Sequence, residues 1–152
     1  MSQLREARSR LAFDPTLTDD RAMLRVALFL PLLLAACPKD ETISGFADSS
    51  AIYALAELDG QRFAPRATIS FPQEGLVKGN GPCNGYSAEQ TVPYPWFKLS
   101  AIRATRRACP DLSREVEFLA ALSEMTLIEA SGDTLILRND AGREMVFLAV
   151  RP

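Results

Sequence analysis

The stretch KGNGPCNGY, Lys78 to Tyr86, sets one cysteine among three glycines and a proline. A cysteine in such a loop can serve as a nucleophile, a metal ligand, part of a phosphate-binding loop or half of a disulfide. The glycine spacing is one residue away from G-x-G-x-x-G, and the residues from Tyr86 onward look like a strand rather than the helix that a dinucleotide-binding loop must open. We therefore predict a tight turn, in which Asn80-Gly81 supplies the positive φ values.

Composition narrows the chemistry that this cysteine could serve. The chain has 152 residues, a formal net charge of −2 and no histidine. The charge balance gives no reason to expect a nucleic-acid partner. Without histidine, Ser-His and Cys-His catalysis is excluded, and the distant cysteines do not supply the four ligands of a zinc site. We therefore expect a non-enzymatic protein with no metal and no cofactor. A basic cluster at Arg103, Arg106 and Arg107 is expected to be solvated surface rather than a lipid or partner contact.

On both sides of this turn the chain is predicted to form short strands. Alternating or β-branched apolar residues, separated by turn signals, favour strands rather than helices. Asp59-Gly60 and residues 139–142 are predicted hairpin turns, and Pro72 is expected to end the strand before it. The predicted strands are Tyr53–Leu58, Ala67–Phe71, Leu76–Lys78, Tyr86–Val92, Trp96–Ile102, Thr134–Leu137 and Met145–Val150.

One helix is expected after Pro110, with Asp111 as its capping residue. Apolar residues recur at helical spacing and predict a face that packs on the sheet. The predicted apolar face consists of Val116, Leu119 and Ala120, extended by Phe118, Leu122 and Met125. We interpret this face as core, not as a cofactor site.

The N-terminal part contains the sequence MLRVALFLPLLLAAC, Met23 to Cys37. A basic residue, an apolar run over 26–36 and small residues before Cys37 occur in the order of a secretory signal. The run is shorter than the roughly 20 apolar residues that span a bilayer. It resembles the lipobox of bacterial lipoproteins, which implies a signal peptide over 23–36 and lipidation of Cys37. A buried hydrophobic helix is the alternative.

The segments around this signal follow from the same interpretation. Residues 1–22 carry acids where a signal peptide needs positive charge, so we interpret them as a mis-assigned extension and Met23 as the true start. Residues 37–50 are polar and small and are predicted to be a flexible, lipid-anchored linker. Residues 51–152 form the domain. Pro38 is not the aspartate associated with inner-membrane retention, which favours the outer membrane.

The domain resembles the META domain family, which includes the HslJ-like bacterial heat-shock proteins. The opening pattern matches at Tyr53, Leu55 and Gly60, and the helix carries Glu115 and Phe118 at the family positions. The central family motif corresponds to Gly79, Gly81, Cys83, Asn84, Tyr86, Thr105 and Cys109. The resemblance implies an α+β fold that is mainly antiparallel β, with a barrel-like curved sheet and one helix packed against it. It implies an envelope protein associated with stress tolerance or antibiotic tolerance, and no established catalytic activity.

The cysteines can now be assigned in this context. Lipidation of Cys37 leaves Cys83 and Cys109 in an oxidising periplasm, where a disulfide between them balances the odd count. Two buried free thiols are the alternative. For the function, we expect a lipid-anchored envelope module that binds a protein partner or supports the envelope under stress. The alternative is a barrel that holds a small apolar ligand in the periplasm.

Overall fold

The computed structural model describes residues 39–64 and 66–150. The predicted extension, signal peptide and lipidated Cys37 lie outside the described residues. Within the described part of the chain, no helix has both the length and the apolar content needed to cross a membrane.

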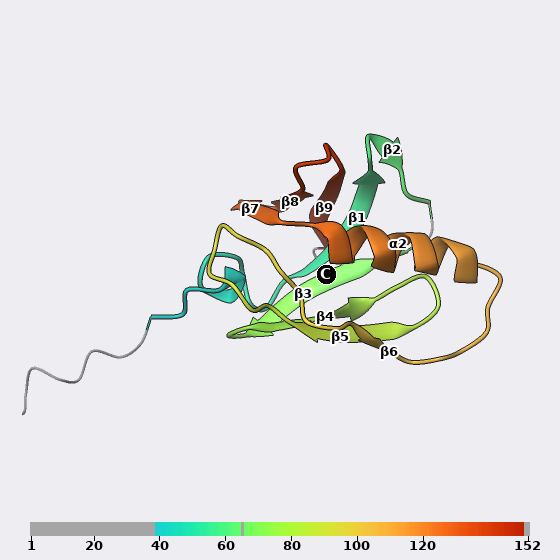
Figure 1. Ribbon diagram of the computed structural model, residues 1–152, viewed down its shortest axis with the longest axis horizontal. Helices are drawn as coiled ribbons and strands as arrows, with labels where there is room; N and C mark the ends of the chain where they lie inside the picture. Colours follow the sequence, from blue (N-terminus) through green and yellow to red (C-terminus); the bar gives the residue numbers. More distant parts are fainter. Residues whose placement is uncertain (1–38, 65, 151–152) are drawn as a thin grey trace, which may run out of the picture. The chain divides into compact units, whose positions relative to one another are not determined.

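The domain is built on one nine-stranded sheet whose neighbouring strands run antiparallel, with the order β6-β5-β4-β3-β1-β9-β8-β7 and β2 paired to β1 alone. One helix, α2 (Leu112–Glu124), runs across one side of it (Figure 1). The mainly antiparallel α+β class is confirmed, but the sheet is open, with β6 and β7 at its two ends. The strands are β1 (Ile52–Leu58), β2 (Gln61–Arg62), β3 (Thr68–Gln73), β4 (Leu76–Asn80), β5 (Gly85–Glu89), β6 (Arg103–Ala104), β7 (Leu127–Ser131), β8 (Thr134–Arg138) and β9 (Glu144–Val150).

The hairpin turns follow the sequence closely. Asp59 and Gly60 have φ values of 52° and 73°, and Gly142 has a φ of 81° at the turn between β8 and β9. Pro72, however, does not end β3, which continues to Gln73. The β3–β4 register shifts between Ser70 and Gln73, so Pro72 lies in an irregular stretch where a missing N–H costs no regular ladder bond.

The expected strand over Trp96–Ile102 is wrong. This segment makes only isolated bridges, Trp96 to Leu127 and Leu99 to Gln90. Its backbone bonds go to several different segments, and no one neighbouring strand pairs along it. Strand β7 and the two-residue strands β2 and β6 were not predicted, because two residues carry no readable period and β7 follows the helix almost directly.

The core lies between the sheet and α2. The helix turns Glu115, Phe118 and Leu122 inward, whereas Val116 is 63% exposed. The predicted face was therefore right at Phe118, Leu122 and Met125 and wrong at Val116 and Ala120. The cap was also wrong, because the Asp111 side chain makes no capping hydrogen bond. Twelve large side chains are less than 2% exposed: Tyr53, Phe71, Phe97, Phe118, Phe147, Ile43, Ile69, Leu122, Ile128, Leu135, Leu137 and Met145.

The described part of the expected linker, residues 39–50, packs against the domain. It contains a short 3-10 helix, η2 (Ile43–Gly45), and the Ile43 side chain is 1% exposed within the core. The Thr42 hydroxyl accepts a hydrogen bond from the Gly75 N–H (3.0 Å), in the turn between β3 and β4. The folded unit therefore starts at least as early as these residues, ahead of the predicted boundary at 51.

Candidate functional site

The family-motif residues meet at the carboxylate of Glu115, on the inward face of α2. The residue is 4% exposed. Its Oε2 atom accepts hydrogen bonds from the backbone N–H groups of Cys83 (2.8 Å) and Asn84 (2.6 Å). Its Oε1 atom accepts a third from the Asn84 side-chain amide (2.7 Å). A buried carboxylate with three donors is stabilised in place, because each donor would otherwise be unpaired away from water.

Asn84 also forms hydrogen bonds with the segment before the helix. Its side-chain oxygen accepts hydrogen bonds from the Thr105 hydroxyl (2.9 Å) and the Arg107 N–H (2.7 Å). The Arg107 guanidinium also donates to the Cys83 carbonyl (3.2 Å). Asn84 therefore joins the turn, the helix and residues 105–107, because its side-chain amide donates through nitrogen and accepts through oxygen.

A disulfide joins Cys83 to Cys109, with 5.9 Å between the Cα atoms and a sequence separation of 26. The predicted pairing is confirmed. Together with the hydrogen bonds, it places distant parts of the chain in one unit. We call this unit the motif cluster; it comprises Gly81, Cys83, Asn84, Thr105, Cys109 and Glu115.

The prediction that Asn80-Gly81 supplies positive φ values is wrong. Neither Asn80 nor Gly81 has a positive φ. A Cβ atom on Gly81 would instead lie 2.8 Å from Oε2 of Glu115, and one on Gly79 would lie 1.9 Å from the Thr68 carbonyl oxygen. These glycines are required because other groups approach the backbone closely, which a local sequence pattern does not reveal.

Tyr86 is buried, and its hydroxyl lies beside Gly79. Its hydroxyl donates a hydrogen bond to the Thr68 carbonyl (2.9 Å). Burial raises the pKa of Tyr86 well above its ordinary value, because the phenolate would be desolvated. The phenol therefore stays protonated and serves as a hydrogen-bond donor between β5 and β3.

The buried polar groups of the motif cluster are all paired. Across the described residues, every buried side-chain nitrogen and oxygen has a hydrogen-bond partner. The same residues contain no group of three or more acidic or cysteine side chains that could hold a metal ion. Both cysteines of the cluster are joined in the disulfide. The cluster therefore stabilises the fold through bonds among its own residues and to Arg107.

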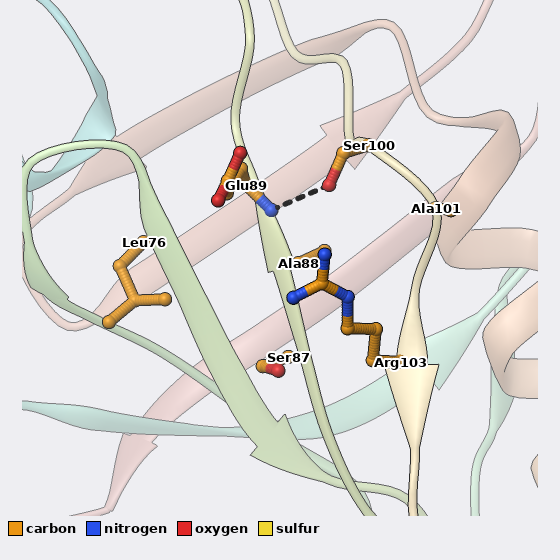
Figure 2. Close-up of a pocket in the computed structure, with 7 residues that line it drawn as sticks. All are labelled: Leu76, Ser87, Ala88, Glu89, Ser100, Ala101 and Arg103. Atoms are coloured by element: carbon orange, nitrogen blue, oxygen red, sulfur yellow. Dashed lines mark hydrogen bonds between the residues drawn. The ribbon is translucent and has the colours of Figure 1, made fainter.

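A small hollow lies between β5 and the segment that leads into β6. Figure 2 shows Arg103 extending over the strand near Ala88, with Leu76 beyond it on β4. The Ser100 hydroxyl accepts a hydrogen bond from the Glu89 N–H (3.0 Å) at its rim. The volume is about 70 Å³, whereas pockets for small molecules span roughly 300–1,000 Å³. This hollow is smaller than a typical small-molecule site.

A larger groove lies on the outer face of β1 and β3, which points away from the core. Its volume is about 500 Å³. Ile52 and Val150 are directly opposite in the β1–β9 pairing and are 52% and 53% exposed. Arg66, Thr68 and Asn80 add polar groups. We call it the outer groove; its lining residues are Ser50, Ile52, Ala54, Arg66, Thr68, Asn80 and Val150.

The open sheet, the covering helix and the disulfide-linked motif cluster define a small mainly antiparallel domain. A family model described as the META domain matches residues 49–152. The chain therefore belongs to the META domain family. It is similar in fold to an NMR structure of a protein from Burkholderia xenovorans, with a TM-score of 0.57 and 19% identity over 78% of this chain and 94% of that chain.

A second NMR structure matches with a TM-score of 0.52 and 19% identity, over 66% of this chain and 90% of that chain. At this identity the likeness shows the fold alone. No curated protein sequence matches the chain. The comparisons thus place the domain in its family without assigning it a partner or a reaction.

The sequence indicated the motif residues, but it did not indicate that Glu115 accepts the hydrogen bonds that hold them together. Glu115 matched the family as one position among others, although its burial on the inward face makes it the centre of the cluster. The outer groove was missed altogether. One signal existed for it, because β1 and β9 carry apolar residues on both faces at their paired ends, where one solvated face should be polar.

Proposed function

We propose that this chain is a non-enzymatic, lipid-anchored protein of the bacterial envelope whose META domain binds a protein partner through the outer groove. The anchor rests on the signal sequence before Cys37, and Pro38 favours the outer membrane. One structural observation supports the binding role above others: Ile52 and Val150 are paired apolar residues, each about half exposed, on the sheet face opposite the core. Exposed apolar surface of this kind is typical of interaction sites.

Charge near the groove indicates the chemistry of the partner. Arg66 lines the groove, and Lys78 is exposed two residues from Asn80 on β4. Within residues 39–64 and 66–150, neither side chain takes part in an ion pair. An apolar segment that carries an acidic residue would complement this surface, because the carboxylate would meet a cation beside the buried contact.

The interior argues against a ligand held inside a barrel. The sheet is open, and twelve large side chains are fully buried in the core. The volume of the outer groove nevertheless falls within the range of small-molecule sites. A small apolar anion in this groove is therefore the second candidate.

A photo-crosslinking amino acid at position 52, in the full chain expressed in a bacterial envelope, tests the proposal. The matched control carries it at Val116, which is also apolar and exposed but lies on α2. We expect a discrete protein adduct from position 52 that Arg66→Glu removes, and none from position 116. Equal adducts from both positions, or none from position 52, would reject the partner role.

Two further measurements separate the anchor from the ligand. Radiolabelled palmitate should label the wild type, and Cys37→Ser should abolish labelling; label retained in Cys37→Ser would reject the anchor. A native mass spectrum of the purified domain that shows a bound small molecule, lost on Ile52→Glu, would favour the second candidate instead.

A further inference from the structure

Aromatic side chains gather where the described chain begins. The rings of Phe46 and Tyr94 stack with centroids 4.2 Å apart and an interplanar angle of 18°. The Lys39 ammonium lies 5.7 Å from the Phe46 ring centroid. Phe46 is 47% exposed and Trp96 is 58% exposed. We call Phe46, Tyr94 and Trp96 the aromatic end; Figure 1 shows the segment around η2 beside the loop that follows β5.

Hydrogen bonds fix these residues to the folded domain. The Tyr94 N–H donates to the Glu41 carbonyl (2.7 Å). The Gln90 side chain, 6% exposed, accepts a hydrogen bond from the Ile43 N–H (3.3 Å) and donates one to the Trp96 carbonyl (3.2 Å). The first described segment and the aromatic loop are therefore one unit, and the position of one determines the position of the other.

The distance to the expected anchor is short. Cys37 precedes Lys39 by two residues, and two extended residues span at most about 7 Å. A lipid on Cys37 would therefore hold Lys39, whose ammonium lies 5.7 Å from the Phe46 ring centroid, near the bilayer surface. The long tether expected from the sequence would have left the domain free to turn away, but residues 39–50 are packed on the domain and provide no such length.

We propose that the aromatic end rests in the headgroup region of the membrane, with Phe46 and Trp96 in contact with lipid. This inference rests on the lipidation in the proposed function. Tryptophan favours this region, because its indole N–H can meet water while the rest of the ring system meets hydrocarbon, and the Phe46 ring contributes apolar surface alone. The contact also adds to the anchor, because exposed apolar rings leave water when the domain settles on the surface.

The charges around the aromatic end indicate which lipids it meets. The first described segment carries Lys39, Asp40 and Glu41. Lys98 follows Trp96 by two residues, and Glu74 precedes Gly75, whose N–H donates to the Thr42 hydroxyl, so acidic residues outnumber basic ones in these segments. Such a surface gains nothing from anionic lipids, so ring burial supplies the contact. The occupant is therefore a zwitterionic phospholipid interface, and added salt should change the contact little.

Trp96 is the sole tryptophan of the chain, so its fluorescence reports on this one position. The test uses the full-length, processed lipoprotein in phosphatidylcholine vesicles whose acyl chains carry bromine near the headgroup. We expect about twofold quenching and a blue-shifted emission relative to unbrominated vesicles, and no quenching of Cys37→Ser protein at the same concentration. A matched control moves the reporter by combining Trp96→Phe with Leu112→Trp, on the N-terminal turn of α2 at the opposite end of the domain (Figure 1).

Each result then has one meaning. Quenching of Trp96 without quenching of the relocated tryptophan supports the proposal. Lipidated protein that sediments with the vesicles but shows unquenched Trp96 overturns the orientation alone and leaves the anchor standing. A mass spectrum without acyl chains overturns both the anchor and the inference built on it.

Discussion

The motif cluster and the outer groove differ in the exposure of their side chains and in how far their polar groups are bonded. In the cluster, Asn84 and Glu115 are 3% and 4% exposed and bond to one another and to their neighbours. In the groove, Ile52 and Val150 are about half exposed. Arg66 makes no ion pair within the described chain. The residues that identify the family are therefore engaged in stabilising the fold, and the exposed apolar surface to which we assign partner binding consists of residues outside that motif.

The largest expected effect comes from removing the centre of the cluster. Glu115→Ala should lower the free energy of unfolding by about 4 kcal/mol, because three donors from Cys83 and Asn84 lose their acceptor in a buried site. Glu115→Gln should cost about half as much, since its amide oxygen still accepts. Urea denaturation with the disulfide intact measures both. The matched control is Glu117→Ala on the exposed side of the same helix, which should cost less than about 1 kcal/mol. Equal costs at 115 and 117 would refute the role of the cluster.

Breaking the disulfide should be the next largest effect. The paired substitution Cys83→Ser with Cys109→Ser should lower the free energy of unfolding by about 3.5 kcal/mol, because a loop closed over a separation of 26 residues restricts the unfolded chain. Urea midpoints of the variant and of the reduced wild type should coincide. Iodoacetamide labelling of both thiols in the exported, unreduced domain would contradict the disulfide.

A third prediction compares two glycines of the same stretch. Gly79→Ala should cost about 2–3 kcal/mol, since its Cβ would lie 1.9 Å from the Thr68 carbonyl and strands β3 and β4 would have to separate. Gly85→Ala is the matched control, because its nearest contact, at 3.5 Å from the Asn80 side chain, is ordinary. Thermal denaturation should place Gly85→Ala at or above the wild type. Comparable losses at both positions would show that flexibility, not space, is what the glycines supply.

The exposed carboxylate of Asp59 should contribute less to the free energy of unfolding than the buried carboxylate of Glu115. The hydrogen bond from Arg143 lowers the pKa of Asp59, with a further contribution from the Glu144 N–H. This stabilisation is present above the unfolded pKa of about 3.9 and is lost as the pH falls through the lower folded value. Asp59→Asn should therefore remove less than about 1 kcal/mol at neutral pH, after solvent screening, and the difference from wild type should vanish in acid. Urea midpoints against pH measure it, with Asp140→Asn on the neighbouring turn as control; a difference that grows in acid would be inconsistent.

The smallest effect on stability should come from the outer groove. Ile52→Thr with Val150→Thr should change the free energy of unfolding by less than about 0.5 kcal/mol, because both side chains are half exposed and threonine suits a strand. The same double variant should lose the crosslink expected at this face. Urea denaturation and crosslinking from a third position, Ala54, measure the two properties in one protein. A large loss of stability would mean that the groove is part of the core.

The sequence predicted much of the fold but less of the site. Hairpins at Asp59-Gly60 and at 139–142 were right, because positive φ values are a local requirement that local residues meet. The strand over Trp96–Ile102 was wrong, since its alternation reflects contacts with several segments rather than one ladder. Val116 was assigned to the core because helical spacing alone fits two overlapping faces, and only the position of the sheet selects between them.

By itself, the sequence predicted the family resemblance, several hairpin turns and, with two free thiols as the alternative, the pairing of Cys83 with Cys109. The turns depend on local residue types, the family resemblance on the order of motifs along the chain, and the pairing on the number of cysteines. Only the tertiary structure decided that Glu115 is the centre of the motif, that Gly79 and Gly81 make room for atoms from elsewhere, and that residues 39–50 pack on the domain. Each of these depends on atoms that meet from distant parts of the chain, so no local pattern contains them.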